Sequence, residues 1–417
     1  MAMRLTEYEQ DMAEGKYGPG LQRAINLLIR YGDACGAEEF VEITSGHVMP
    51  KEPPELLEQF TEGVKSLPVM TTLHPLMSAF SPEKWREMGI SEKYAHSELE
   101  DYDRREKLHT RLGFLKTYSC LPMNMGNLPR SGDCISWIGS CAQILANSML
   151  GARANKDGTV VSLCAALTGR TPKTGLLLDE NRHATVLVTL EDGLELHGDA
   201  DFGAMGYYIG TQVANKSIAV EGLKRTVTFD QLKYLIAPAA ASGSIHVFHV
   251  IGITPEAPSK EAAFGGKEPE QTIVVTRKNL EETKAFFPFD RAREADLLLL
   301  GCPHITVQEA GVIAGVLKGK KLKPGKRFWM AMGKPVYTLA KTMGYTDAIE
   351  AAGGIISDTC MATIPDSPIP QGVKVVLTNS FKCAHYVRSL QKDRVEIMIG
   401  DLPDCLAMMT EEEGGVI

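Results

Sequence analysis

The chain lacks the patterns that mark several common classes of protein. It contains no CxxC pair, no internal repeat, no low-complexity tract and no block of like charges. No apolar run approaches the ~20 residues that a helix needs to cross a bilayer, and residues 1–18 lack the cationic and apolar segments of a secretory signal peptide. With a net charge of −8, the chain offers no basic stripe to nucleic-acid phosphates. We therefore expect a cytoplasmic protein whose partners include neither a membrane nor nucleic acid.

Nucleotide-binding fingerprints are missing as well. The segments GLLLDENR and GVIAGVLKGKK fit neither the phosphate-binding loop GxxxxGK[ST] nor the dinucleotide motif GxGxxG. What the chain has is an ordinary globular composition, with 44% hydrophobic and 23% charged residues. Its 417 residues are enough for two or three lobes with buried cores.

Apolar runs and helical patterns alternate along most of the chain. LQRAINLLIRYGDACG predicts a helix over about 20–35, and PVYTLAKTMGYTDAIEAAG predicts one more helix. LPVMTTLHP and GFLKTYSCLP predict strands. In the last third, strands and helices alternate from ADLLLLGCPH to VKVVLTNSFK, which is typical of βαβ units and a parallel sheet. The prediction is a multi-lobed α/β fold with largely parallel sheets.

The middle of the chain differs in pattern. From about 183 to 253, short apolar segments predict a β-rich region with one helix near FDQLKYLIAPAAAS. Residues 254–271 are rich in Pro, Gly and charge, and are the best linker candidate. We therefore expect lobes at 1–182, 183–271 and 272–417, the second being a β-richer insert.

The nine cysteines are scattered and odd in number, so a disulfide framework is not expected in a cytoplasmic chain of this length. Most of them fit the ordinary role of small buried side chains. Three differ, because each follows an apolar run and precedes a loop: Cys120 in YSCLP, Cys302 in LGCPH and Cys360 in SDTCM. Ligands of open α/β sheets bind beyond the carboxyl ends of the strands. Three thiols at such ends are placed to converge on one point.

Three converging thiolates would narrow the choice of metal. Sulfur-only ligation selects zinc or an iron–sulfur cluster. A cubane held by three cysteines leaves one iron open to substrate, where it acts as a Lewis acid. A zinc ion with three cysteines and a water is the competing interpretation, and the spacing does not separate the two.

Longer segments of the chain resemble the large subunit of the aconitase X family. They are SCLPMNMGNLPRSGDCISWIGSCAQILANSMLGARANKDG, AALTGRTPKTGLLLDENR, GCPH, SDTCM, TNSFKCAHY and FDQLKYLIAPAAASGSIHVFHVIGITPEA. The likeness runs from LTEYEQDMAEGKYG to near residue 390, with the motifs in order. The family includes phosphomevalonate dehydratases, built from a large and a small subunit, and cis-3-hydroxy-L-proline dehydratases, in which both parts are usually fused. The resemblance implies an aconitase-like fold over 1–417 and a lyase that removes water from a small hydroxy acid.

The same resemblance implies a cofactor and a partner. The thiols of Cys120, Cys302 and Cys360 are expected to hold an iron–sulfur cluster, 4Fe–4S or 3Fe–4S, with 2Fe–2S as an alternative because the CxxC pair of ordinary aconitase is missing. The family's swivelling domain is expected to supply a serine base. The sequence begins and ends where the family's large subunit does, so we expect that domain as a separate small subunit docked near 120–131, 302–306 and 360–365.

A dehydratase also needs groups that hold its substrate. The planar fork of an arginine matches a carboxylate or a phosphate. Without the resemblance, solvated arginines and local Ser or Asn caps would be the simpler interpretation of the polar residues in the motif-dense region. With it, the substrate-binding candidates are Arg130, Asn147, Ser148, Arg153, Asn155 and Arg170, together with His304 beside a presumed ligand.

Three further side chains are candidates for catalysis. His47 ends the segment ITSGH, and Ser380 and Lys382 follow the apolar strand VKVVL in TNSFK. An imidazole serves as an acid or a base, and a lysine at a strand end meets an anion. A core histidine and a solvated lysine are the structural alternatives.

The preferred function is removal of water from mevalonate 5-phosphate or a similar substrate, because LPMNMGNLPR is closer to that branch of the family. A cis-3-hydroxy-L-proline dehydratase is the first alternative. The second belongs to another class, a non-catalytic iron–sulfur sensor or regulatory subunit.

Overall fold

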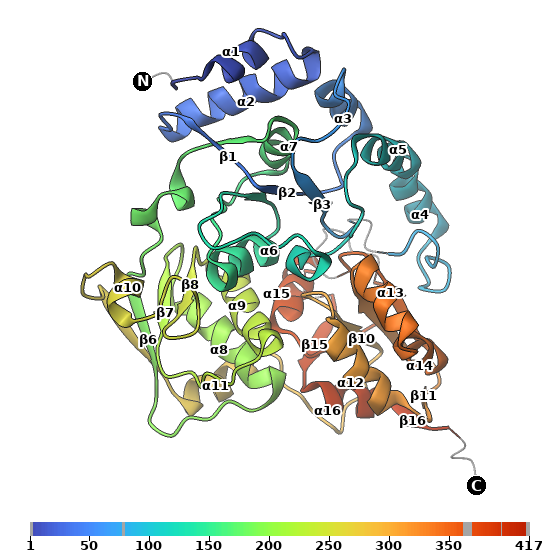
Figure 1. Cartoon of the computed structure of the whole chain (residues 1–417). Coiled ribbons are helices and arrows are strands. Elements are labelled where there is room, and N and C mark those ends of the chain that lie inside the picture. The colour runs from blue at the N-terminus through green and yellow to red at the C-terminus, as the bar shows by residue number, and fades with distance from the viewer. Residues whose placement is uncertain (1–2, 77–79, 362–368, 393, 414–417) are drawn as a thin grey trace.

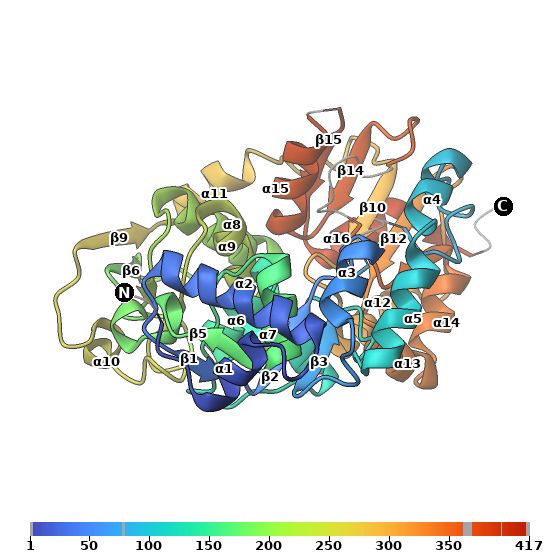
Figure 2. The ribbon, with the colours of Figure 1, turned by 90° about the horizontal axis from the view of Figure 1, so that it is seen from above.

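The computed structural model describes residues 3–76, 80–361, 369–392 and 394–413. The chain folds into three parts, each with a parallel sheet of its own (Figure 1). The N-terminal part (blue to green) lies above the other two. The middle part (green to yellow) and the C-terminal part (orange to red) lie on opposite sides below it, and Figure 2 shows the same separation from above. The predicted α/β fold with largely parallel sheets is confirmed.

The N-terminal part packs helices around a three-stranded sheet of order β3-β2-β4. The predicted helix at 20–35 is present as α2, which begins at Pro19 and ends before Gly36, whose φ of 74° stops the helix. Its apolar face packs on α7, which in turn covers β2. The elements are α1 (Glu7–Ala13), α2 (Pro19–Cys35), β1 (Phe40–Glu42), β2 (Ser45–Val48), α3 (Pro54–Thr61), β3 (Met70–Leu73), α4 (Glu92–Leu99), α5 (Tyr102–Leu112), η1 (Pro122–Met125), β4 (Ser136–Trp137), α6 (Ser140–Leu145), the π-helix η2 (Ala146–Leu150), α7 (Thr159–Thr168), β5 (Arg170–Pro172), η3 (Gly175–Leu177) and η4 (Asp179–Asn181).

The strand predicted to end at Cys120 is wrong. Only Leu115 pairs, as an isolated bridge to Thr72, because the segment then runs past Leu73, the last residue of β3. Beyond that point the chain turns: Thr117 N bonds back to the Leu115 carbonyl at 2.8 Å, Tyr118 takes a φ of 44°, and Ser119 N bonds to the Leu73 carbonyl at 3.2 Å. Cys120 therefore sits at a bend of an irregular segment rather than at a strand end.

The middle part is a four-stranded parallel sheet of order β8-β7-β6-β9 with long helices packed against it. The prediction of a single helix here is wrong, since α8 precedes the expected α9. Glycines hide the helical pattern of α8: a side-chain carbon on Gly206 would lie 1.8 Å from the Leu235 carbonyl oxygen of α9. The two helices approach closely only because that carbon is absent. The elements are β6 (Val186–Leu190), α8 (Gly198–Gln212), β7 (Ile218–Val220), α9 (Phe229–Gly243), β8 (Phe248–Val250), α10 (Lys260–Phe264), β9 (Gln271–Val275) and α11 (Arg277–Lys284).

The C-terminal part is a five-stranded parallel sheet of order β13-β12-β10-β14-β15. Its central strand β10 is buried on both faces, which explains the unbroken run LLLL. The long helix predicted from PVYTLAKTMGYTDAIEAAG is two helices, because Gly344 takes a φ of 76° between them. The elements are β10 (Leu297–Leu300), α12 (Val307–Leu317), β11 (Lys320–Leu322), β12 (Arg327–Ala331), α13 (Lys334–Thr342), α14 (Tyr345–Ala351), β13 (Gly354–Ser357), β14 (Val375–Thr378), α15 (Phe381–Leu390), β15 (Glu396–Ile399), α16 (Leu402–Met409) and β16 (Thr410–Glu412).

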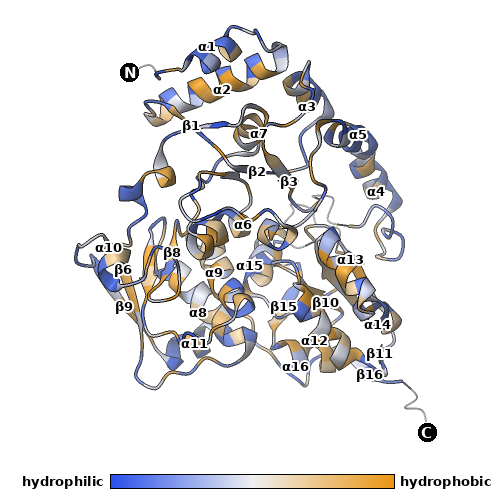
Figure 3. Cartoon of the chain, in the orientation of Figure 1, coloured by the Kyte–Doolittle hydropathy of each residue, from blue (hydrophilic) through white to orange (hydrophobic). Residues whose placement is uncertain are grey.

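Hydropathy follows this layering. The strands are largely apolar, while many helices carry polar residues on their outer side and apolar residues toward the interior (Figure 3). Within the described ranges, no helix is long and apolar enough to cross a membrane.

Candidate active site

A cavity of about 200 Å³ lies between the N-terminal and C-terminal parts. We name it the thiol cavity, because five cysteines line it. Its wall also holds two histidines and one lysine, groups that bind anions or exchange protons. The lining residues that shape its chemistry are His74, Cys120, Gly139, Cys141, Cys302, His304, Cys360, Lys382 and Cys383.

The three cysteines predicted as ligands reach this cavity from three segments. Cys302 follows β10 after one residue, and Cys360 follows β13 after two. The residue between β10 and Cys302 is Gly301, at a φ of 97°, and a side-chain carbon there would lie 2.2 Å from the Ala331 carbonyl oxygen. The backbone thus turns tightly enough to present Cys302 to the cavity only because the residue is a glycine.

The thiols of Cys120 and Cys141 interact and shift each other's pKa in opposite directions. Cys120 and Cys141 are hydrogen bonded, and this contact holds the pKa of Cys120 well below its usual value. Burial, and then the same contact, raise the pKa of Cys141 well above its usual value. The His304 backbone N–H donates to Cys120 Sγ at 3.3 Å, which also favours the charged sulfur. Of the two sulfurs, Cys120 is the one whose charged form is favoured.

A buried cation faces these sulfurs. Lys382 is 5% exposed. Burial alone would lower its pKa, but the negative charge of the neighbouring sulfurs in their thiolate form, Cys141 and Cys302 foremost, raises the pKa above its usual value and favours the ammonium. His304 lines the same cavity, with Nε2 at 3.3 Å from the Thr359 carbonyl oxygen and a buried Nδ1 that has no hydrogen-bond partner among the described residues.

These residues fit a sulfur-ligated metal group. Three thiols from separate segments, a nearby ammonium and a buried imidazole nitrogen in need of a partner supply ligands and hydrogen bonds for an anionic cluster. Across the described ranges, no three His, Cys, Asp or Glu side chains are grouped to hold one metal ion. The three predicted ligands therefore share one cavity without being grouped at a single point.

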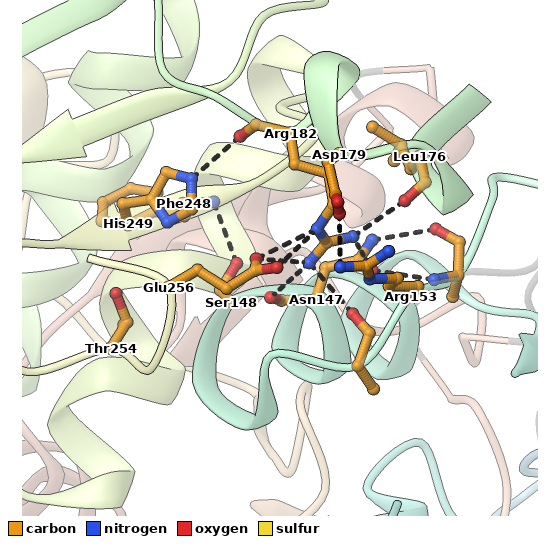
Figure 4. A network of polar contacts seen from close by, with 12 residues as sticks. Asn147, Ser148, Arg153, Leu176, Asp179, Arg182, Phe248, His249, Thr254 and Glu256 are labelled. Carbon is orange, nitrogen blue, oxygen red and sulfur yellow. Dashed lines mark hydrogen bonds and ion pairs between the residues drawn. The ribbon is translucent and has the colours of Figure 1, made fainter. Parts of the chain in front are cut away.

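Three predicted substrate-binding residues lie instead in a buried polar network around Arg182 (Figure 4). Asn147 exchanges hydrogen bonds with the backbone of Ala154, both at 2.9 Å, and accepts from Arg182 at 3.1 Å. The Ser148 hydroxyl accepts from the Phe248 N–H at 2.9 Å, and Arg153 is ion paired with Asp179. None of the three is among the residues that line the thiol cavity.

Three more of the seven predicted substrate-binding residues are also outside the cavity lining, whereas the seventh, His304, is part of it. The Asn155 side chain bonds to the backbone of Thr174 and Leu176. Arg170 forms ion pairs with Glu9 at 3.0 Å and Glu42 at 2.9 Å. Arg130 is exposed, and its backbone N–H donates to Asp133.

The predicted catalytic residues divide between the wall and the layer behind it. Lys382 lines the cavity. Ser380 caps α15 and donates to the carbonyl of Cys302. It thereby supports residues 302–306, which we name the ligand loop. His47 is fully buried one hydrogen bond behind His74, with 2.9 Å between His47 Nε2 and His74 Nδ1. Of the loops expected to receive a small subunit, residues 362–365 lie outside the described residues.

Sequence reasoning missed three lining residues, His74, Cys141 and Cys383. His74 carried a signal, since it follows strand β3 and precedes Pro75, as Cys302 follows β10 and precedes Pro303. Cys141 and Cys383 lie near the beginnings of α6 and α15, where sequence alone gives no sign of what they face.

Comparisons with known proteins agree with this architecture. Family models for the first, second and third domains of aconitase X match residues 2–180, 184–285 and 295–411. The phosphomevalonate dehydratase large subunit of Methanocaldococcus jannaschii is 35% identical, with 97% of this chain and 99% of its own length covered. The cis-3-hydroxy-L-proline dehydratase of Pseudomonas aeruginosa is 32% identical, with 93% of this chain but 67% of its own length covered.

A solved structure gives the same result in three dimensions. The holo-form crystal structure of Thermococcus kodakaraensis aconitase X superposes with a TM-score of 0.84 at 32% identity, over 98% of this chain and 100% of that one. Fold and relatives together define the class of protein: a dehydratase, which is a lyase of the aconitase-like superfamily. Within that class, the chain belongs to the aconitase X family.

Proposed function

We propose that this chain holds an iron–sulfur cluster on Cys120, Cys302 and Cys360, and removes water from mevalonate 5-phosphate or a closely similar hydroxy acid. The observation that carries the proposal is that these three thiols, from three segments of the chain, line one cavity together with the ammonium of Lys382. When bound, the cluster supplies an iron that acts as a Lewis acid. A 4Fe–4S or 3Fe–4S cluster fits three thiol ligands, and 2Fe–2S is the alternative.

The protein's own groups supply charge and shape. Lys382 is held as a buried cation and is positioned to bind a carboxylate or phosphate oxygen. His304 and Lys382 are buried, and burial strengthens the electrostatic contacts that they make inside the cavity. His304 and Ser380 hold two of the proposed ligands in place. The His304 backbone N–H donates to Cys120 Sγ, and the Ser380 hydroxyl donates to the Cys302 carbonyl.

The choice of substrate rests on the relatives. Those covered almost end to end are named phosphomevalonate dehydratase large subunits, whereas the hydroxyproline enzyme is covered over 67% of its length. The same names support a separate small subunit as the partner of this chain. The family resemblance, which implies a serine base on the swivelling domain, supports the same partner.

The test is an assay of the anaerobically purified complex of this chain with the small subunit of the same organism. We expect turnover of mevalonate 5-phosphate and none of cis-3-hydroxy-L-proline. Turnover of the second substrate alone would move the chain to the other branch of its family. A protein with an intact cluster that turns over neither would support the sensor alternative and contradict the proposal.

A further inference from the structure

A chain of buried hydrogen bonds runs through the N-terminal part and ends on His74 at the thiol cavity. Its members are Asn127, Thr72, His47 and His74, which are 1%, 0%, 0% and 7% exposed. Burial lowers the pKa of His47 to about 3 and that of His74 well below its usual value, so both rings are neutral. A neutral imidazole carries one hydrogen on one of two nitrogens, and the neighbours of the ring decide which.

The direction in which hydrogens are donated along this series of hydrogen bonds is set at its buried end. The carbonyl oxygen of Gly46 can only accept, and Asn127 Nδ2 lies 3.0 Å from it. The same Nδ2 lies 3.0 Å from Thr72 Oγ1. The amide of Asn127 is therefore oriented with its two hydrogens toward these oxygens, because the opposite orientation would set two acceptors against each other.

The positions of the hydrogens on Thr72, His47 and His74 follow from this orientation of Asn127. Thr72 Oγ1 already accepts from Asn127, and its own hydrogen has two choices: His47 Nδ1 at 2.9 Å or the Gly46 carbonyl at 3.5 Å. The shorter bond, to His47 Nδ1, is favoured. His47 then has its hydrogen on Nε2 and donates to His74 Nδ1 at 2.9 Å. The one hydrogen of the His74 ring is left on Nε2.

The ring of His74 lines the thiol cavity. In the part of the chain that the structure describes, the one hydrogen bond of the His74 ring uses Nδ1, and the ring lines the cavity with Cys120 and Lys382. Gly139 lies against the ring, since a side-chain carbon there would be 2.3 Å from His74 Cε1. The ring is thus fixed both by its hydrogen bond and by packing.

We infer that His74 is a substrate-contacting residue whose Nε2–H donates to a hydroxyl or carboxylate oxygen of the hydroxy acid, and that Asn127, Thr72 and His47 are positioning residues that fix this tautomer. The identity of the ligand rests on the proposed function, whereas the tautomer does not. A fixed donor at this point adds a second oriented contact to the charge of Lys382. It also assigns His47 a role behind the site rather than in it.

The tautomer is measured directly by ¹⁵N NMR of the full chain labelled at histidine, with the His74 signals assigned by their loss in His74→Phe. We expect hydrogen on Nε2 and not on Nδ1. Thr72→Val should populate the other tautomer, because the donor to His47 Nδ1 is gone. Thr71→Val is the matched control: it is a buried neighbour whose hydroxyl bonds to the Val69 carbonyl instead. Hydrogen on Nδ1 of His74 in the wild type, or no change in Thr72→Val, would overturn the tautomer assignment, whatever the chain is found to catalyse.

The contact with substrate is tested by kinetics of the complex. His74→Phe removes the donor, and His74→Gln replaces it with an amide N–H. We expect KM to rise about 10- to 100-fold in His74→Phe, as for a lost hydrogen bond to a charged oxygen, with little change in kcat. His74→Gln should recover most of that loss. Equal losses in both variants, each with a normal melting temperature, would show that His74 does not donate to substrate.

Discussion

At the scale of single residues, the wall of the thiol cavity depends on two positions that only glycine can occupy without strain. Gly301 lets the backbone turn against the Ala331 carbonyl, and Gly139 leaves room for the ring of His74. Both glycines take a positive φ, 97° and 92°, which other residues adopt at a cost. The positions of Cys302 and His74 are therefore coupled to residues that have no chemistry of their own.

Replacing Gly139 with alanine should test that coupling. The new carbon would meet His74 Cε1 at 2.3 Å and would strain a backbone at φ 92°. We expect a loss of about 1–3 kcal/mol in stability from the backbone strain alone, together with a clear loss of kcat/KM as the ring is displaced. Gly158→Ala is the control, since nothing lies within 4 Å of its added carbon. Melting temperature and steady-state kinetics are the measurements, and a normal Gly139→Ala enzyme would contradict this packing of Gly139 on His74.

Glu52 should make stability depend on pH. Burial raises the pKa of this carboxyl from 4.5 to about 7, and its Oε1 has no partner among the described residues. Because the folded pKa lies above the unfolded one, the carboxyl's contribution is fully present below pH 4.5 and is lost as pH rises through 7. That shift of about 2.5 units corresponds to roughly 3 kcal/mol.

Glu52→Gln should therefore match the wild type at pH 4.5 and be more stable at pH 8. Melting temperatures of the two proteins across this range are the measurement. A difference that does not grow with pH would mean that Glu52 is not buried as a neutral acid.

The place of a residue in the site could be predicted where the sequence puts that residue directly after a buried strand. Cys302 and Cys360 follow buried strands, so their place at one cavity could be anticipated, and their role as ligands stays a prediction. His74 carried the same mark, but a lone histidine beside a proline is common. The partners of the arginines could not be predicted, because Glu9 lies 161 residues before Arg170 in the sequence.

At the scale of elements, local signals gave the helices that start and stop with standard residues. α2 has a proline at its start and a glycine after its end, and α12 has a capping box between Thr306 and Glu309. The prediction failed for α8, whose glycines serve close packing, and for the α13–α14 pair, whose break is a single left-handed glycine. In both cases, tertiary contacts or a single backbone dihedral angle decided the structure, and the spacing of apolar residues alone did not predict it.

Arg182 is expected to hold the π-helix η2 in place. It is 2% exposed and donates to the carbonyls of Asn147, Ala152 and Leu176, while pairing with Glu256 at 2.6 Å. Arg182→Met would leave these acceptors unpaired, and breaking a buried pair of this kind costs about 3–5 kcal/mol.

The matched control is Arg130→Met, in the exposed loop, which should change stability by no more than about 0.5 kcal/mol. Chemical denaturation gives both values. Equal effects of the two substitutions would show that the Arg182 network does not stabilise the fold. A loss of turnover in Arg130→Met without a loss of stability would support the substrate-binding role predicted for Arg130.

At the scale of the whole molecule, a buried ionic cluster joins the middle and C-terminal parts next to the ligand loop. Lys233 is fully buried, pairs with Glu309 and lies 3.5 Å from the His304 carbonyl. Tyr234 donates to the same carboxylate at 2.7 Å. Helix α9 of the middle part is thereby fixed against the segment that carries Cys302, so a distant part of the chain supports the cavity.

The small subunit is expected to be required for turnover. The described wall of the thiol cavity supplies thiols, a cation and hydrogen-bond donors, and the family resemblance leads us to expect the serine base on the small subunit. We expect a native complex on co-purification, and activity of the isolated chain at least about 100-fold below that of the complex, the size of a missing general base. Full turnover by the isolated chain would require a base from within, with Ser380 and His47 the first to examine.

The central claim is that Cys120, Cys302 and Cys360 hold an iron–sulfur cluster. Its most direct test is the iron and acid-labile sulfide content of the anaerobically purified complex, compared between Cys302→Ser and Cys405→Ser. Cys405 is equally a free thiol, but it is fully buried in α16 with its sulfur near the Thr378 and Gly400 carbonyls. We predict that the wild type and Cys405→Ser contain iron and sulfide in similar amounts, and that Cys302→Ser loses both. Full iron content in Cys302→Ser, or zinc in place of iron in the wild type, would contradict the account.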